Sequence, residues 1–303
     1  MDALVISNLR KEYGKQEAVK GISFSIPQGG FFGFLGPNGA GKTTTIKCIM
    51  GLLKFEGSIA VMGHDVVKEH TAVSRLIGFS SQEFDFDLFL SVEQTISYAA
   101  GFYGMKGKEV KKRTEELLQQ FSLTEHRKKS IRALSGGMKR RLIIARGLVH
   151  RPKMLILDEP TAGVDVQLRR DLWEQLSALN KAGTTIILTT HYIEEAERLC
   201  DTIGIINKGK IIALDSKEKI MENLGSQTLH ITTKEPVARG TLPDADCLVL
   251  YEGTKLTIKG KGIKKKAKGI LSSLESKGIE VVEVDAKEES LESIFLRIVG
   301  EQQ

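Results

Sequence analysis

The sequence has 303 residues, a formal net charge of +6, a pI near 9.0 and 41% hydrophobic residues. This length allows two domains, or one large α/β domain with an appendage, and the composition is typical of an ordinary soluble globular protein. The longest apolar runs are far shorter than the roughly 18 residues that a bilayer-spanning helix needs, which excludes a chain that crosses a membrane by itself.

The charge and the cysteines exclude several other classes. From residue 225 onward the chain has 12 Lys and Arg against 12 Asp and Glu, so the whole positive excess lies before that point. An excess this small suits polyanionic ligands or an anionic membrane surface, but equally suits no special partner. Cys48, Cys200 and Cys247 are far apart and form no C-x-x-C pair, which indicates reduced thiols in a cytosolic protein rather than a zinc or redox site. The first residues show no signal peptide.

The chain begins with two predicted strands, over residues 4–9 and 19–26. Tyr13 lies between them. An aromatic residue just before a phosphate-binding loop can stack on an adenine ring, but on local evidence alone such a residue is more often a packing residue.

A phosphate-binding loop follows a predicted buried strand at 30–35. Gly36, Gly41, Lys42 and Thr43 match the pattern G-x-x-x-x-G-K-[ST]. Glycines let successive backbone N–H groups point into one concavity, and the helix that follows adds its unpaired donors and the positive end of its dipole. The residues expected to surround the phosphates are Gly36, Pro37, Asn38, Gly39, Ala40, Gly41, Lys42, Thr43 and Thr44.

Short strands are predicted at 57–62 and 77–80, and a helical pattern follows from 93 to 121 with a break at 101–107. Gln82 follows the second strand, where a glutamine near a nucleotide can hold Mg²⁺ or the attacking water. The segment 83–90 alternates aromatic and acidic residues, so it predicts either a docking groove or part of the core.

A second potential anion site lies in the run 134–141, before a helix predicted at 142–149. Ser135 stands at an N-cap position, and Gly136 and Gly137 leave backbone N–H groups open. Taken alone, the pattern could also be only a helix cap.

The apolar run 154–160 predicts a buried strand that ends in two carboxylates, Asp158 and Glu159. In an α/β sheet this strand end lies where such sheets bind ligands. Asp158 is placed to hold Mg²⁺ through water, and Glu159 is the natural general base for a hydrolytic water. A helix at 168–179 and another buried strand at 184–190 are predicted next. His191 follows the end of this strand and is a candidate contact for the γ-phosphate.

The rest of the chain divides near Gly225. A hairpin of strands 203–206 and 211–213 and a helix at 217–223 complete the first domain, over residues 1–224. Beyond it, a small α+β domain is predicted over residues 225–303. Its elements are strands at 229–233, 247–250, 255–259 and 279–285 and helices at 263–274 and 291–299.

The combination of Leu-Ser-Gly-Gly at 134–137, Leu-Ile-Leu-Asp-Glu-Pro at 155–160 and a strand-borne histidine closely resembles the ATP-binding cassette (ABC) ATPases, over about residues 3–215. The resemblance implies an α/β P-loop NTPase core, a RecA-like mixed sheet with antiparallel strands. It also implies a helical subdomain at about 84–150.

The resemblance further implies the ligands, ATP and Mg²⁺, and the residues that hold them. Tyr13 matches the aromatic that stacks on adenine, and residues 36–44 match the Walker A loop. Asp158 matches the Walker B aspartate. Gln82 matches the glutamine that senses Mg²⁺ and the attacking water, and Thr43 matches the hydroxyl ligand of the ion.

Glu159 matches the family's catalytic glutamate and His191 its switch histidine. In this family two cassettes pair head to tail, and each ATP lies between the Walker A loop of one subunit and the signature motif of the other. Ser135, Gly136 and Gly137 would therefore contact the nucleotide of a second copy, which implies a homodimer.

The signature ends in Met138 where many relatives have Gln, and this stretch with 159–166 resembles the ATPase subunits of ABC-2 type exporters. The expected protein is an ATPase on the inner face of the cell membrane, cytoplasmic and peripheral. It would drive a separate integral membrane permease, whose coupling helix is received near 83–90, and no nucleic acid is expected as a partner. The alternative is a soluble ABC ATPase of translation or DNA maintenance. The tail from Gly225 resembles accessory domains and has no motif that carries chemistry.

Overall fold

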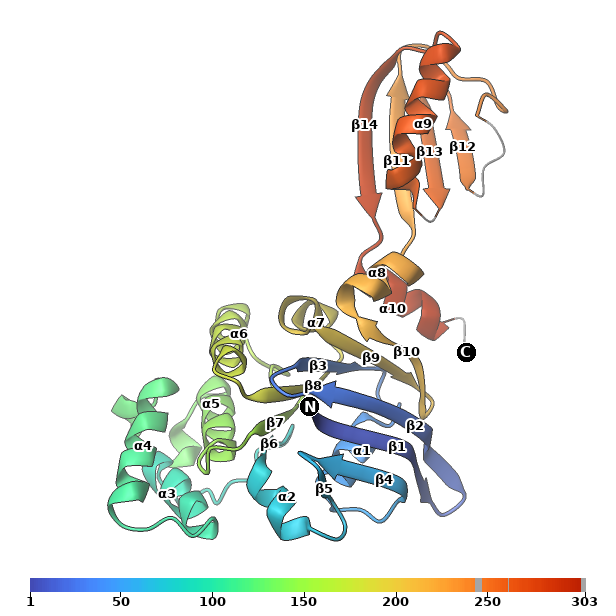
Figure 1. Ribbon diagram of the computed structural model, residues 1–303. Coiled ribbons are helices and arrows are strands. Elements are labelled where there is room, and N and C mark those ends of the chain that lie inside the picture. Colours follow the sequence, from blue (N-terminus) through green and yellow to red (C-terminus); the bar gives the residue numbers. More distant parts are fainter. Residues whose placement is uncertain (243–246, 261, 301–303) are drawn as a thin grey trace. The chain divides into compact units, whose positions relative to one another are not determined.

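The computed structural model describes residues 1–242, 247–260 and 262–300, and the chain forms two compact units, Met1–Leu214 and Asp215–Gln303. The predicted α/β architecture is confirmed (Figure 1). Each unit has a sheet and a hydrophobic core of its own.

The first unit contains two sheets. The antiparallel sheet has the order β2 (Gln16–Pro27), β1 (Asp2–Tyr13), β4 (Glu56–Val61), β5 (His64–Asp65). The larger sheet has the order β10 (Lys210–Ser216), β9 (Thr202–Asn207), β3 (Phe31–Leu35), β8 (Thr185–Thr190), β7 (Met154–Asp158), β6 (Ile77–Ser80). Its neighbours from β9 to β6 pair in parallel. Every residue of β3, β7 and β8 is buried, as continuous apolar runs in a parallel sheet require.

The two sheets are joined by an aromatic cluster in the core. Phe24 of β2 stacks on Phe32 of β3 with ring centroids 5.2 Å apart, and Phe34 lies 5.8 Å from Phe24. Because β3, β6, β7 and β8 run parallel, the loops that follow them leave the sheet at one edge. Residues 36, 82, 159 and 191 of the sequence prediction all follow these four strands.

Helices cover the larger sheet, and a group of three of them stands at one end of the first unit (Figure 1). The helices of this unit are α1 (Lys42–Ile49), α2 (His70–Leu76), α3 (Val92–Phe102), α4 (Lys108–Gln120), α5 (Gly136–Gly147), α6 (Val166–Lys181) and α7 (Ile193–Leu199), with 3-10 turns at Thr124–His126 and Ile131–Ala133. The group of three is α3, α4 and α5.

Helix α5 begins six residues earlier than predicted, so the predicted helix at 142–149 was wrong at its start. Ser135 caps the helix, and its Oγ accepts a hydrogen bond from Met138 N at 3.2 Å. This cap offsets the low helix propensity of the two glycines in the first turn. At the other end, Arg113 of α4 donates from Nη2 to Leu148 O at 2.6 Å and from Nε to Val149 O at 3.1 Å, which ties α4 to the two residues directly after α5.

The second unit is a four-stranded antiparallel sheet with a helix packed on it. Its elements are α8 (Lys217–Leu224), β11 (Gln227–Thr233), β12 (Leu248–Glu252), β13 (Lys255–Gly260), α9 (Ile263–Ser276), β14 (Val281–Glu288) and α10 (Leu291–Gly300), with sheet order β12-β13-β11-β14. The structure divides the chain after Leu214, ten residues before the predicted boundary, because α8 packs against α10. Sequence reading had placed that helix with the first domain.

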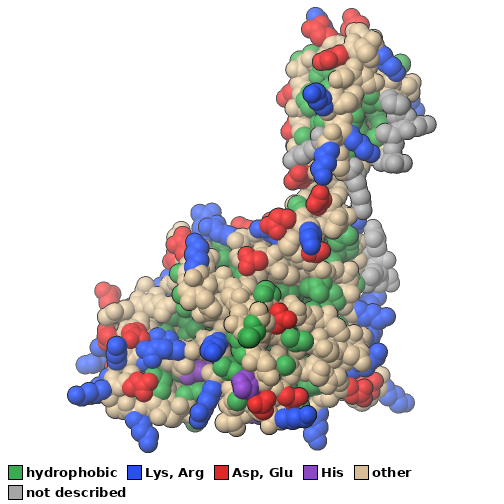
Figure 2. Space-filling model, viewed as in Figure 1, with side chains coloured by type: hydrophobic (Ala, Val, Ile, Leu, Met, Phe, Trp, Pro, Cys, Tyr) green, Lys and Arg blue, Asp and Glu red, His purple; other side chains and the backbone are tan. Residues whose placement is uncertain are grey.

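The surface charge is mixed. On the face drawn in Figure 2, basic and acidic side chains alternate over the helices of the first unit. None of the helices in the described residues combines the length and the apolar character that crossing a membrane requires.

His150, directly after α5, gives the first unit a titratable group with a shifted pKa. Its Nε2 lies 3.0 Å from Ile77 O, its ring stacks on Tyr103 with centroids 3.7 Å apart, and burial lowers its pKa from 6.5 to about 4. Between these two values the unfolded chain takes up a proton that the folded chain does not. The free energy of unfolding should therefore fall as the pH falls through this range.

We expect His150→Gln to flatten that part of the pH dependence. Urea unfolding of both chains across the range measures it. Parallel curves for the two chains would contradict the assignment to His150.

Candidate nucleotide site

The loop between β3 and α1 depends on glycine at three positions. A Cβ on Gly36 would lie 2.3 Å from Ile206 O, and one on Gly41 would lie 2.7 Å from Ala18 O. Gly41 has φ +112° and Gly39 has φ +78°, both in the left-handed region that favours glycine. Helix α1 starts at Gly41 with no side-chain cap and no acidic residue in its first turn, so its N-terminal dipole and N–H groups suit an anionic ligand.

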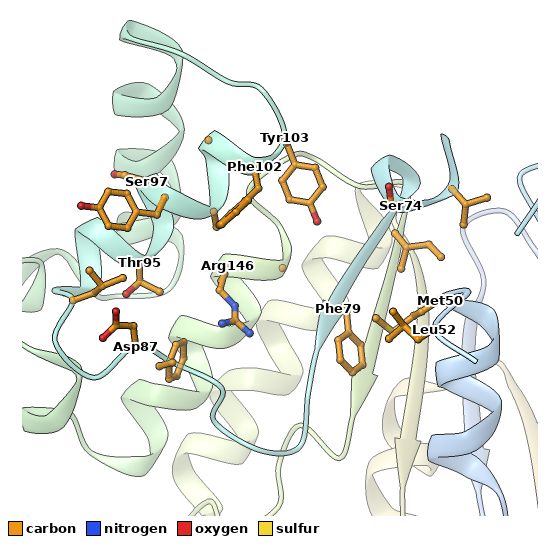
Figure 3. Close-up of a pocket in the computed structure, with 18 of the residues that line it drawn as sticks. Met50, Leu52, Ser74, Phe79, Asp87, Thr95, Ser97, Phe102, Tyr103 and Arg146 are labelled. Atoms are coloured by element: carbon orange, nitrogen blue, oxygen red, sulfur yellow. The ribbon is translucent and has the colours of Figure 1, made fainter. Parts of the chain in front are cut away.

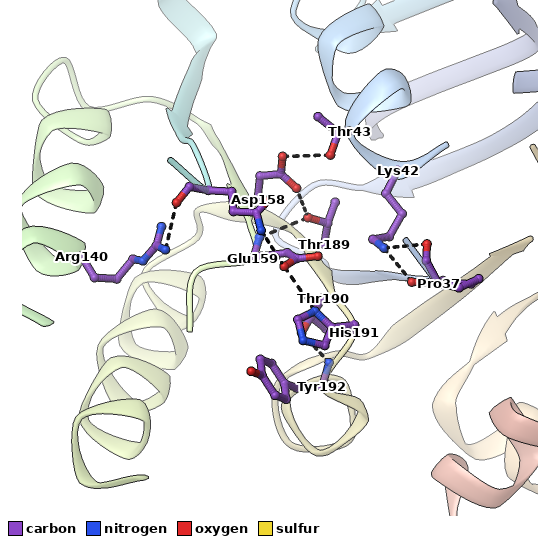
Figure 4. Close-up of polar contacts among 12 residues, drawn as sticks. Pro37, Lys42, Thr43, Arg140, Asp158, Glu159, Thr189, Thr190, His191 and Tyr192 are labelled. Atoms are coloured by element: carbon purple, nitrogen blue, oxygen red, sulfur yellow. Dashed lines mark hydrogen bonds and ion pairs between the residues drawn. The ribbon is translucent and has the colours of Figure 1, made fainter. Parts of the chain in front are cut away.

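Lys42 places a positive charge at this loop (Figure 4). Its side chain is buried, and Nζ donates to Gly36 O at 2.6 Å and to Pro37 O at 3.2 Å. Burial lowers the pKa of Lys42, and the nearby carboxylates of Glu159 and Asp158 partly offset this effect. The loop therefore has one buried cation and two acidic groups close to it.

Asp158, the last residue of β7, is oriented by two hydroxyl groups. Its Oδ2 accepts from Thr43 Oγ1 at 3.2 Å, and its Oδ1 accepts a short hydrogen bond from Thr189 Oγ1. A carboxylate beside a hydroxyl at a phosphate loop is a donor set that suits Mg²⁺, which is usually bound by one or two carboxylates together with phosphate oxygens. In the described residues, this site included, no group of three or more His, Cys, Asp or Glu could hold a metal ion.

Glu159 is the point where three of the predicted residues meet. Its Oε2 accepts from Gln82 Nε2 at 3.1 Å and lies 3.2 Å from His191 Nδ1 (Figure 4). Its backbone has φ +48°, a left-handed conformation that costs a non-glycine residue roughly 1–3 kcal/mol. Thr189 stabilises this conformation. Glu159 N donates to the Thr189 carbonyl at 3.0 Å and to the Thr189 hydroxyl at 3.2 Å.

The signature segment is separate from these residues. In the described part of the chain, no hydrogen bond or ion pair joins Ser135, Gly136 or Gly137 to Lys42 or Glu159. Ser135 and Gly136 are exposed, and a Cβ on Gly137 would lie 1.7 Å from Leu168 Cδ2. The helix cap that the sequence offered as one alternative is present, and the nucleotide contact remains a prediction.

Tyr13, at the end of β1, is not a core residue. Its side chain is 49% exposed, with Lys11 Nζ 5.0 Å from the ring centroid. The ring is therefore accessible to a planar ligand.

Sequence reasoning missed two residues that organise the site. Thr189 binds both Asp158 and Glu159, and its position two residues before His191 on an apolar strand was the available signal. Arg140 in α5 is 2% exposed and donates to the backbone carbonyls of Ser81 and Gln82. Its spacing from the buried Ile144 and Gly147 placed it on an inward face.

A groove of 1010 Å³ lies between the helical group and the rest of the first unit (Figure 3). Phe102, Tyr103 and Arg146 line one side, and Met50 and Leu52 line the other. Several of its apolar residues and their neighbours are exposed: Phe102 90%, Phe89 82%, Leu52 60%, Tyr98 56% and Phe84 41%. The aromatics of segment 83–90 are thus at the surface rather than in the core.

This fold and site define a nucleotide-binding protein of the phosphate-loop class, and comparison with known proteins identifies its family. Residues 19–162 match the family model described as ABC transporter. The linearmycin resistance ATP-binding protein LnrL of Bacillus subtilis (strain 168) is 38% identical, with 98% of each chain covered. The daunorubicin/doxorubicin resistance ATP-binding protein DrrA of Streptomyces peucetius is 34% identical and covers 98% of this chain and 92% of its own length.

Solved structures of ATP-binding cassettes are also similar to this chain. An ATP-binding subunit of an ABC transporter matches with a TM-score of 0.68 at 28% identity, over 73% of this chain and 92% of that chain. The ATP-binding cassette MJ0796, in a dimeric post-hydrolysis state bound to ADP and Pi, matches with a TM-score of 0.65 at 26% identity, over 70% and 98%.

The chain belongs to the ABC transporter family. It is an ATP-binding and ATP-hydrolysing transport subunit. Of the two functions predicted from the sequence, transport is confirmed over translation or DNA maintenance, because the relatives are named as resistance and export ATP-binding proteins and the family model is that of ABC transporters.

The close approach at Gly36 predicts a specific loss of ATP affinity. In Gly36→Ala the new methyl group meets a backbone carbonyl that cannot rotate away, so the loop must shift. Overpacking of roughly 1–3 kcal/mol corresponds to an ATP Kd raised about five- to hundredfold. Titration calorimetry with ATP measures it. Gly101→Ala is the matched control, because a Cβ there meets nothing within 4 Å, and equal affinities for the two variants would contradict the steric argument.

Proposed function

We propose that this protein is the cytoplasmic ATPase subunit of an exporter, in which two copies close around two ATP molecules and drive a separate membrane permease. The observation that carries the proposal is the convergence of Gln82 and His191 on Glu159 Oε2, at 3.1 Å and 3.2 Å, beside the phosphate loop. Export is supported by the relatives, which are named for drug resistance and, in Ralstonia nicotianae, for Nod factor export.

Glu159 acts as the general base in this proposal. The carboxylate is held by the amide of Gln82 and lies close enough to Lys42 to affect its pKa, so it is placed to accept a proton from a water beside the phosphates. His191 Nδ1 lies 3.2 Å from the same carboxylate oxygen, so its ring is a second polar group that would help to position the attacking water. Lys42 and the N–H groups of the loop stabilise negative charge on the phosphates.

Thr43 and Asp158 would hold Mg²⁺, with Asp158 acting through water and Gln82 close by. The ion supplies charge neutralisation on the phosphate oxygens when it is bound. The hydroxyl of Thr189 keeps the Asp158 carboxylate aimed at Thr43. Tyr13 would stack on the adenine with its exposed ring face.

A second copy completes the site. One chain has two helix N-termini that suit anions, at Lys42 and at Ser135, and these are separate within the chain. A single nucleotide uses both if Ser135, Gly136 and Gly137 come from a partner in head-to-tail arrangement. The related cassette that was solved as a dimer supports this arrangement.

The groove beside segment 83–90 is the proposed permease site. It is lined mainly by apolar and aromatic side chains, and exposed apolar patches of this kind mark protein contacts. Docking there would hold the protein at the inner face of the membrane.

The composite site predicts that Glu159→Gln forms a stable dimer with ATP. The substitution removes the base but keeps the shape of the side chain, so ATP is bound and not consumed. Gel filtration with and without ATP shows the shift from monomer to dimer. The control is the double variant Lys42→Ala, Glu159→Gln, which should stay monomeric. If Glu159→Gln stays monomeric with ATP bound, the composite site is wrong.

The groove predicts that Phe102→Asp separates the protein from its permease. A charge replaces a side chain that is 90% exposed at the groove, and losing such an anchor costs about 2 kcal/mol or more, over tenfold in affinity. Co-purification with the membrane fraction measures the loss. Val282→Asp, at an apolar position that is 64% exposed in the second unit, is the control. Unchanged membrane association of Phe102→Asp would rule out docking at this groove.

A further inference from the structure

The segment from Ser81 to Asp87, here called the Gln82 loop, is held by two arginines of one helix. Arg140 donates from Nη1 to Ser81 O at 2.9 Å and from Nη2 to Gln82 O at 3.1 Å. Arg146, six residues further along α5, donates from Nη1 to Asp85 O at 2.6 Å. Both ends of the loop backbone are therefore bonded to α5.

Each arginine also stacks on a phenylalanine of the same loop. The guanidinium carbon of Arg140 lies 4.9 Å from the centroid of the Phe84 ring, and that of Arg146 lies 5.1 Å from Phe86. The two rings stack on each other with centroids 6.2 Å apart and planes 11° from parallel. The loop thus presents both backbone carbonyls and aromatic rings to the two arginines of α5.

A planar guanidinium is required for this double contact. It can donate two hydrogen bonds in a fixed fork while its face lies against a ring, which an ammonium group cannot do. Arg140 is also buried, at 2% exposed, although burying a cation is costly. The carboxylates of Glu195, Asp158 and Glu159 lie near enough to offset part of the fall in its pKa that burial causes. The two site carboxylates thus interact electrostatically with the buried charge of Arg140, which the structure joins directly to the Gln82 loop.

We infer that Arg140 is a positioning residue that fixes the Gln82 loop on α5, with Arg146 holding the far end, and that it acts on ATP hydrolysis through the contact of Gln82 with Glu159. Helix α5 also starts at Ser135, so the loop of one nucleotide site and the signature segment of the other form one body. This inference rests on the proposed roles of Gln82 and Glu159.

A double-mutant cycle on ATP turnover by the purified full chain tests the inference. The four proteins are the wild type, Arg140→Gln, Gln82→Ala and the double variant. In Arg140→Gln we expect kcat to fall about tenfold or more, as misplacement of a catalytic contact does, while KM for ATP stays within about twofold because the phosphate loop is untouched. In the Gln82→Ala background the same change should lower kcat by less than about twofold.

A purely structural role for Arg140 gives a different result. Its effect on kcat would then be the same with and without Gln82, and that additive outcome would overturn the inference. Wild-type kcat in Gln82→Ala would overturn it as well. Failure of the proposed function is distinguishable, because it appears as full turnover by Glu159→Gln.

Two further variants keep the test decisive. Arg132→Gln is the matched control. Arg132 belongs to the 3-10 turn Ile131–Ala133, and its guanidinium carbon lies 4.8 Å from the centroid of the Phe89 ring. We expect this substitution to change kcat by less than about twofold. If Arg140→Gln does not fold, Phe84→Leu removes the stacking and keeps the guanidinium. We expect a smaller fall in kcat that again vanishes in the Gln82→Ala background, and an equal fall in both backgrounds would overturn the inference.

Discussion

The parallel pairing of β7 with β8 is the constraint on which the nucleotide site depends. The register sets Asp158 opposite Thr189, and this one pairing has two consequences. The threonine hydroxyl donates to the aspartate, and the threonine backbone accepts from Glu159 N. A shift of one residue would turn these side chains to the other face of the sheet. The two carboxylates can therefore differ in orientation and role although they are adjacent in sequence.

The same pairing explains why the strain at Glu159 persists. A left-handed glutamate is stable only where its surroundings over-determine it. Here its N–H is bonded to Thr189, and its carboxylate meets Gln82 from the end of β6 and His191 from the end of β8. Three neighbouring strands thus fix one side chain. The buried ammonium of Lys42 lies close enough for this carboxylate to raise its pKa against the effect of burial, so the charges of the site support one another.

The sequence was sufficient for features that are encoded locally. The buried strands, the glycine loop before Lys42 and the strand-end positions of Asp158, Glu159 and His191 follow from short patterns, and the sheet and the helical group agree with them. The start of α5 was wrong: the helix was predicted from residue 142, whereas it begins at Gly136, directly after the Ser135 cap. The domain boundary differed because the packing of α8 on α10 joins residues about seventy positions apart. For Thr189 and Arg140 the local pattern indicates a buried position, but the partners that they bind lie far away in the sequence and are not encoded in it.

Helix α5 connects several functional parts of the first unit. Ser135 of the signature segment caps its N-terminus, Arg140 in its middle holds the Gln82 loop, and Arg113 bonds the carbonyl of Leu148 directly after its last residue. Its 12 residues span about 18 Å. Arg146, which lines the groove, and Arg140, which donates to the backbone of Gln82, both belong to this helix. A permease docked at the groove as proposed would therefore contact the same helix that holds the Gln82 loop beside Glu159.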